Sequence, residues 1–139
     1  MTHANGLAVH VVADCDACVV VRVSGALDHI GEQFFRTTMG GYVDTGYRFV
    51  VLDCSALVYC NSRGLNCLLG LHWLLGRRRG RLLLACVGRR VQWMLDHTGS
   101  REVLAVFPTV SRALASLPVA VRPAWPPPHP HPVSAEPGI

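Results

Sequence analysis

The stretch from Phe49 to Gly76 constrains the fold of this chain more than any other part. It begins with an apolar run from Phe49 to Leu52, closed by Asp53, and a second short apolar segment follows from Ala56 to Cys60. An apolar run of this length between turn signals is typical of a strand that is buried on both faces. A polar corner and a strongly apolar helical pattern come next, so we predict a buried strand that leads into a helix.

The polar corner is Asn61-Ser62-Arg63-Gly64, and the helical pattern after it runs from Leu65 to Leu75. Asn61 or Ser62 is well placed to cap this helix, because short polar side chains accept hydrogen bonds from the free amides of the first turn. The amino end of a helix carries partial positive charge, and an anion is tolerated there. The corner therefore presents a serine at the exposed positive end of a helix, and we expect the function to lie there.

The rest of the chain alternates between strand-like and helix-like segments. Two β-rich runs, Leu7 to Val12 and Val19 to Val23, predict an antiparallel hairpin. An amphipathic stretch from Ile30 to Val43 predicts a helix, which Gly40-Gly41 would fray or end early. The remaining expected elements are strands at Leu82 to Val87 and Val103 to Phe107, and helices at Arg89 to His97 and Thr109 to Leu117.

The order of these elements, β-β-α-β-α-β-α-β-α, predicts an α/β fold in a single domain. Alternating strands and helices imply a sheet that is mostly parallel after the N-terminal hairpin, with right-handed crossovers. Because the strands are short and the helices few, we expect a small mixed sheet with about four helices mainly on one side.

Composition divides the chain into three parts: an N-terminal extension at residues 1–6, the domain at 7–117, and a tail at 118–139. The tail holds eight of the nine prolines, so we expect it to be disordered or in a polyproline conformation. Trp125 either docks back on the domain or is exposed. His129 and His131 are too few for a metal-binding tract.

The charge of the chain argues against nucleic acid as a direct partner. The formal net charge is +4, and all 13 basic residues are arginines. A charge of this size spread over the chain is weak evidence for nucleic-acid binding, which usually shows a concentrated basic face. The basic turn Arg77-Arg78-Arg79 either complements the end of the preceding helix or is an electrostatic docking site for a partner or nucleic acid. No segment has the roughly 18 consecutive apolar residues of a membrane-spanning helix, and the first residues lack the pattern of a signal peptide. The expected location is the cytoplasm.

The six cysteines fit reduced thiols better than a disulfide framework in that compartment. Cys54, Cys60, Cys67 and Cys86 fall in apolar runs and read as small buried side chains. Cys15 and Cys18 form a lone C-x-x-C without the second pair that a zinc site needs. A small enzyme that uses this pair is the weakest hypothesis, and no hydrolase elbow, P-loop or dinucleotide motif is present. We expect no metal, no cofactor and no enzymatic activity.

Taken together, these segments resemble the STAS domain of bacterial anti-sigma factor antagonists, over about residues 7–117. The resemblance rests on Ser24-Gly25-Ala26-Leu27-Asp28, on Leu52-Asp53-Cys54-Ser55, on Asn61-Ser62-Arg63-Gly64-Leu65, on the strand from Gly80 onward, and on Val91 to Gly99. The family pattern at the corner is Asp-Ser-Ser/Thr-Gly-Leu, with the first serine phosphorylated. Ser62 matches that position.

The resemblance implies partner switching. The unphosphorylated domain binds an anti-sigma factor, usually a serine kinase with a histidine-kinase-like ATPase fold, and so frees the sigma factor. Phosphorylation of Ser62 by that kinase would expel the antagonist, and a phosphatase would reset it. An apolar surface near the first hairpin would permit a homodimer. The residues expected to bind the partner are Asp28, His29, Asn61, Ser62, Arg63, Gly64 and Asn66.

The corner departs from the family pattern at two positions. Asn61 replaces the aspartate and Arg63 replaces the second hydroxyl residue. Arg63 could pair with a phosphate on Ser62, repel a basic partner, or be solvated. These departures support an alternative function, a ligand-sensing or scaffold domain of the same fold that has lost phosphoregulation, in which Ser62 is only a helix cap.

Overall fold

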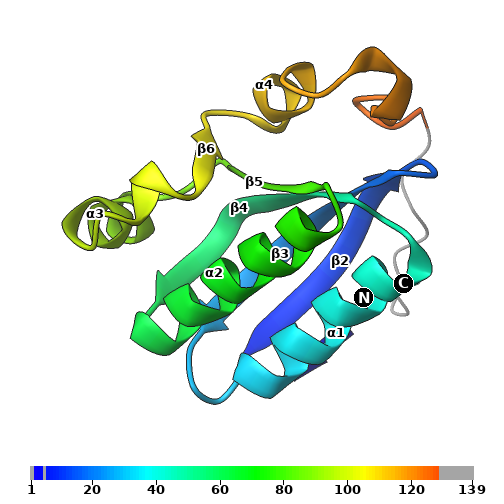
Figure 1. Cartoon of the computed structure of the whole chain (residues 1–139). Coiled ribbons are helices and arrows are strands. Elements are labelled where there is room, and N and C mark those ends of the chain that lie inside the picture. Colours follow the sequence, from blue (N-terminus) through cyan, green and yellow to red (C-terminus); the bar gives the residue numbers. More distant parts are fainter. Residues whose placement is uncertain (1, 5, 129–139) are drawn as a thin grey trace.

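The computed structural model describes residues 2–4 and 6–128, which form a six-stranded sheet whose strands lie side by side in chain order (Figure 1). Strands β1 to β3 pair antiparallel, and β3 to β6 pair parallel, as predicted for a mixed sheet. The strands are β1 (Thr2–Ala4), β2 (Leu7–Asp14), β3 (Cys18–Leu27), β4 (Phe49–Cys60), β5 (Arg81–Ala85) and β6 (Ala105–Phe107). The helices are α1 (Glu32–Thr45), α2 (Ser62–Arg77), α3 (Arg89–His97) and α4 (Val110–Ala115), with short 3-10 helices η1 (Ser100–Glu102) and η2 (Val119–Val121).

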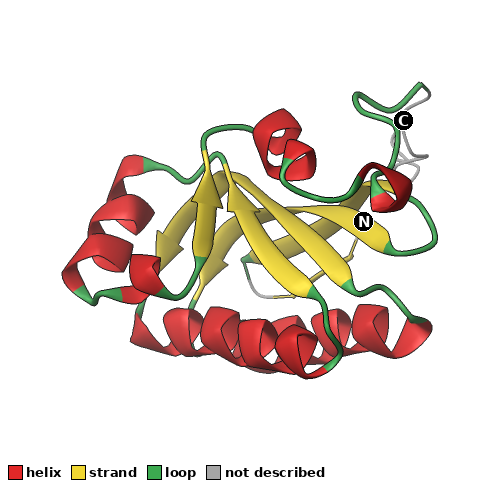
Figure 2. Ribbon diagram, turned by 45° about the horizontal axis from the view of Figure 1, so that its top comes forward, coloured by secondary structure: helices red, strands yellow, loops and turns green. Residues whose placement is uncertain are grey.

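The sheet separates two apolar layers of unequal size. Helices α1 and α2 cover one face, α4 and η2 lie over the other, and α3 stands at the side of the sheet (Figure 2). Side chains of β4 alternate between the layers: Val50 and Leu52 pack in the larger layer with the first three helices, and Phe49 and Val51 pack in the smaller layer with α4. This arrangement confirms the expectation of helices mainly on one side.

Strand β4 is longer than the sequence predicts, since Asp53 does not end it. Asp53 is buried, and its Oδ2 lies 3.1 Å from Nε of Arg22 on the neighbouring strand β3. Its Oδ1 accepts a hydrogen bond from the backbone amide of Ser55 at 3.0 Å. With its charge paired across the strands, the carboxylate is tolerated inside the sheet, and β4 continues to Cys60.

Several further boundaries differ from the prediction: strand β3, for example, runs to Leu27 and not to Val23. Those of α1 and β6 have a visible cause. Helix α1 runs through Gly40 and Gly41 to Thr45, because Phe35, Met39 and Val43 bury one face of it against the sheet. Strand β6 begins at Ala105 and not at Val103, because the chain just before it is coiled. The amides of Val103 and Leu104 both donate to the carbonyl of Ser100, so these residues close the η1 turn.

Both ends of the described chain add to the domain. Residues 2–4, in the expected N-terminal extension, form β1 and pair with β2. Residues 118–128, the first part of the expected tail, lie against the smaller apolar layer, where Trp125 is half-buried. Arg122 donates to the carbonyl oxygens of Leu117 at 2.8 Å and Ala115 at 3.1 Å. The rest of the expected tail, with His129 and His131, lies outside the described residues.

Candidate functional site at the carboxyl edge of β3 and β4

The corner predicted from the sequence lies at the edge of the sheet where β3 and β4 end. Leu27 and Cys60 are the last residues of these parallel strands and face each other in register. The carboxyl ends of parallel strands meet at one edge of a sheet, where ligands and partners commonly bind. The loop from Asp28 to Gly31 and the corner from Asn61 to Gly64 therefore lie side by side.

Asn61, and not Ser62, caps helix α2. Asn61 has extended backbone angles, and its side-chain Oδ1 accepts a hydrogen bond from the amide of Gly64 at 3.0 Å. Ser62 is the first residue of the helix and is exposed. Its hydroxyl has no hydrogen-bond partner within the described part of the chain. The structure thus leaves this hydroxyl accessible at the amino end of a 16-residue helix.

Gly64 holds the first turn of α2 close to strand β3. A Cβ atom at this position would collide with the carbonyl oxygen of Leu27 and would lie 2.8 Å from Sγ of Cys60. The amide of Asn61 also donates to the Leu27 carbonyl, at 3.3 Å. The start of the helix is therefore fixed by backbone contacts, and a glycine is required for them.

The two other expected residues on this edge have different surroundings. Asp28 uses its Oδ1 to accept hydrogen bonds from the amides of Ile30 at 3.0 Å and Gly31 at 3.3 Å, which shapes the loop before α1. His29 is exposed in this loop. Asn66 is exposed on the first turns of α2. The structure brings all seven expected partner-binding residues to one edge.

Arg63 is not free, as its guanidinium forms an ion pair with Glu32 at the start of α1. Nη1 of Arg63 lies 2.8 Å from Oε1 of Glu32, and Arg36 contacts the other carboxylate oxygen at 3.3 Å. The hydrogen bond from Arg63 is the main cause that lowers the pKa of Glu32 below its ordinary value. Two arginines thus share one carboxylate beside Ser62.

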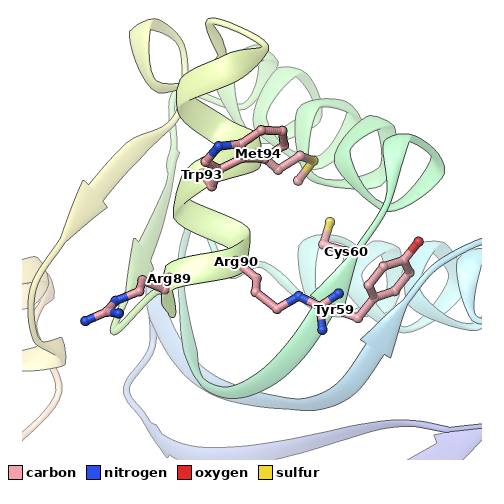
Figure 3. Close-up of a pocket in the computed structure, with 6 residues that line it drawn as sticks. All are labelled: Tyr59, Cys60, Arg89, Arg90, Trp93 and Met94. Atoms are coloured by element: carbon pink, nitrogen blue, oxygen red, sulfur yellow. The ribbon is translucent and has the colours of Figure 1, made fainter.

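A groove next to the corner was not predicted from the sequence. It has a volume of about 550 Å³ and lies between the end of β4 and helix α3 (Figure 3). Its lining residues are Tyr59, Cys60, Arg89, Arg90, Trp93 and Met94. The signal available in the sequence was Trp93, a large aromatic residue beside the arginines of a short amphipathic helix.

The cysteines are mostly packing residues. Cys18, Cys54, Cys60 and Cys67 are buried, as predicted for the last three, whereas Cys86 is only partly buried. Burial raises the pKa of the Cys60 thiol to about 12, so it stays protonated beside the corner. Within residues 2–4 and 6–128, no three side chains of the metal-ligating types gather in one place. None of the helices described has both the length and the hydropathy needed to cross a bilayer.

Comparison with known proteins agrees with this geometry. The family model described as the STAS domain matches residues 9–113. An anti-sigma F factor antagonist of Paenibacillus polymyxa is 28% identical over 102 residues, which cover 73% of this chain and 87% of that protein. The crystal structure of an anti-sigma factor antagonist from Mycobacterium paratuberculosis has a TM-score of 0.69 at 26% identity, and covers 78% of this chain and 93% of that one.

The fold also matches SpoIIAA, the Bacillus cell fate determinant, in two forms. Its unphosphorylated form, titled an anti-sigma factor antagonist, has a TM-score of 0.64 at 21% identity and covers 73% of this chain and 89% of that one. Its phosphorylated form has a TM-score of 0.58 at 19% identity, with coverage of 73% and 92%. At these identities the likeness concerns the fold.

Proposed function

The chain belongs to the STAS domain family, and from that premise we propose that it is an anti-sigma factor antagonist switched by phosphorylation of Ser62. In the unphosphorylated state it binds a kinase-type anti-sigma factor and frees a sigma factor. The kinase transfers a phosphoryl group to Ser62 and the antagonist dissociates, until a phosphatase removes the phosphate. The proposed place of action is the cytoplasm, where sigma factors work.

One observation carries the proposal: the Ser62 hydroxyl is exposed at the first position of α2, while Asn61 does the capping. The hydroxyl oxygen of a serine that capped the helix would accept a hydrogen bond from a backbone amide. Ser62 has no such task, so a kinase can reach it without loss of a native hydrogen bond. A protein of the same fold, SpoIIAA, has been solved in both unphosphorylated and phosphorylated forms, which supports phosphorylation as the kind of switch.

The physical basis of the switch is electrostatic. A phosphate on Ser62 adds about −1.5 to −2 charges at neutral pH. The helix terminus tolerates this charge in the free domain, because the first amides of α2 point toward it. In a packed interface the same phosphate must lose its water, which is costly without new partners. Phosphorylation therefore weakens the complex and leaves the fold intact.

The two departures from the family pattern are compatible with this switch. Asn61 keeps the cap that an aspartate would supply, through its hydrogen bond to the Gly64 amide. Arg63 is bound to Glu32, and a phosphate on the neighbouring Ser62 would compete with that carboxylate for the guanidinium. The exchange would help the free domain to carry the added charge.

A phosphotransfer experiment tests the modification. The full chain is incubated with ATP and the purified anti-sigma kinase of the same organism, and its intact mass is measured. We expect the mass of one phosphate on the wild type and none on Ser62→Ala. Ser111→Ala is the matched control, because Ser111 is an exposed serine in the first turn of α4 on the other face of the sheet. Unchanged mass for the wild type would refute phosphorylation at this corner.

A binding experiment tests the switch. Ser62→Asp places a negative charge in the proposed interface, and we expect it to weaken binding to the same kinase at least tenfold, roughly 1.4 kcal/mol. Ser111→Asp carries the same charge outside the interface and should bind like the wild type. If Ser62→Asp and the wild type bind the kinase with equal affinity, a negative charge at this position is not what switches binding.

A further inference from the structure

We propose that the groove between the end of β4 and helix α3 is the second half of the partner-binding surface, and that it receives an acidic, partly apolar segment of the anti-sigma factor. The inference rests on the proposed function, since it assigns the chemistry of that partner. It adds Tyr59, Arg90 and Trp93 to a surface so far limited to the corner and the loop before α1.

The groove is continuous with the corner. Cys60, which lines it, is the residue directly before Asn61, and Tyr59 precedes it on the same strand. Across the gap, Arg90, Trp93 and Met94 come from α3 (Figure 3). A protein seated on Ser62 would therefore meet this groove without leaving the carboxyl edge of the sheet. A volume of about 550 Å³ can hold several side chains of a partner segment.

Large apolar side chains are exposed at the groove. Trp93 is 61% exposed and Tyr59 is 40% exposed. One side of the Trp93 indole stacks on His97, with ring centroids 3.8 Å apart and an angle of 24° between the planes. A tryptophan already supported in this way loses little conformational freedom on binding. Tryptophan, tyrosine and arginine are the residues that most often dominate interface energies.

The charge at the groove is positive and unbalanced. Arg90 lies over the ring of Tyr59, with Cζ 5.8 Å from the ring centroid, and neither Arg89 nor Arg90 has a carboxylate within ion-pair distance among the described residues. The lining holds no aspartate or glutamate. Figure 3 shows the Arg90 guanidinium directed toward Tyr59, whereas the Arg89 side chain points away from the groove. An occupant that brings a carboxylate would gain a charge-assisted contact with Arg90, whereas a basic one would be repelled.

The shape of the exposed surface favours a protein segment over a small molecule. The groove is open to solvent, and Trp93 and Tyr59 in its lining expose large apolar surfaces. A small ligand would leave those surfaces uncovered. A segment with an apolar residue against Trp93 and an acidic residue toward Arg90 would cover the groove and match its charge.

The test measures affinity of the full chain for the purified anti-sigma kinase by isothermal titration calorimetry. We expect Arg90→Glu and Trp93→Ala each to weaken binding about tenfold, roughly 1.4 kcal/mol. Arg90→Glu should also flatten the dependence of binding on salt. Arg112→Glu is the matched control: Arg112 is exposed on α4, on the other face of the sheet, and should bind like the wild type.

Thermal unfolding of each variant checks that the domain is intact, since all of these side chains are at the surface. If Arg90→Glu and Trp93→Ala bind with wild-type affinity while Ser62→Asp binds more weakly, the groove is not part of the partner-binding surface, and the proposed function is unaffected. If the wild type does not bind the kinase, both the proposed function and the role of the groove are wrong. Equal losses in Arg112→Glu and Arg90→Glu would also count against the groove, because only overall charge would then matter.

Discussion

Arg63 Nη1 and Glu32 Oε1 lie 2.8 Å apart, and this ion pair joins the first turn of α2 to the first residue of α1. It spans the two loops that form the candidate site. Because the loops follow neighbouring parallel strands, the pair fixes how the corner with Ser62 sits relative to the loop with Asp28.

This pair predicts a pH-dependent stability. The pKa of Glu32 is lowered from 4.5 in the folded chain, mainly by the hydrogen bond from Arg63. The stabilisation is thus fully present above pH 4.5 and is lost as the pH falls through the lowered pKa. Glu32→Gln should lower the free energy of unfolding at roughly pH 7 and have a smaller effect at roughly pH 3, as measured by urea denaturation.

Asp44→Asn is the control for that experiment. Asp44 is exposed on α1 and lies 3.7 Å from Arg78, so the variant removes a carboxylate with a longer and more solvated contact. At neutral pH, Asp44→Asn should lower the free energy of unfolding less than Glu32→Gln does. If Glu32→Gln and the wild type unfold alike at both pH values, the ion pair does not hold the loops together.

Asn61 provides a second prediction, on the start of α2. Replacing it with alanine removes the acceptor for the Gly64 amide and should cost about 1 kcal/mol of unfolding free energy. Asn61→Asp keeps the acceptor and adds a negative charge at the amino end of the helix, so it should be as stable as the wild type or more so. Denaturation in low and high salt would show whether that gain is electrostatic. Equal stability of all three proteins would mean that the cap contributes nothing.

Glycine-to-alanine substitutions give a third prediction, with opposite signs at two positions. Gly64→Ala forces a methyl group against the Leu27 carbonyl and Cys60 Sγ, and should destabilise the domain by about 1–3 kcal/mol. Gly41→Ala meets no atom within 4 Å in the middle of α1, and should stabilise it by about 0.5–1 kcal/mol through helix propensity. Thermal unfolding measures both. A stabilised Gly64→Ala variant would show that α2 does not approach β3 as closely as described.

The core of the candidate site could be predicted because its signals are local. The apolar run, the polar corner and the helical pattern that place Ser62 at a helix start are all within one stretch of sequence. Which of Asn61 and Ser62 is the cap could not be predicted, since either side chain can accept the bond. The geometry of the backbone at Asn61 decides it.

The features that sequence reasoning missed depend on contacts between distant segments. Asp53 resembles a strand end until Arg22 on the neighbouring strand pairs with it. Gly40 and Gly41 have low helix propensity, yet burial of Met39 and its neighbours keeps α1 intact. The groove joins the end of β4 to a helix about 30 residues further along the chain, which only the order of strands in the sheet brings together.

The last prediction concerns Trp125, whose packing holds the segment after α4 against the domain. Its side chain is half-buried against the smaller apolar layer, which includes Ala13, Cys18 and Leu114. Trp125→Ala should therefore lower the free energy of unfolding by about 1–2 kcal/mol, measured by urea denaturation followed by circular dichroism. The loss would arise from apolar surface of the sheet that the ring now shields from water.

Trp73→Ala is the matched control for this variant. Trp73 is 62% exposed on α2, and its ring contacts His72 with centroids 4.9 Å apart. Removing it should change stability by less than about 0.5 kcal/mol, since it shields little of the core. If Trp125→Ala is no more destabilising than Trp73→Ala, the Trp125 ring does not contribute to the stability of the fold. A clear difference would place the boundary of the domain after Trp125 and not at residue 117, because the smaller face of the sheet would then need that ring as its cover.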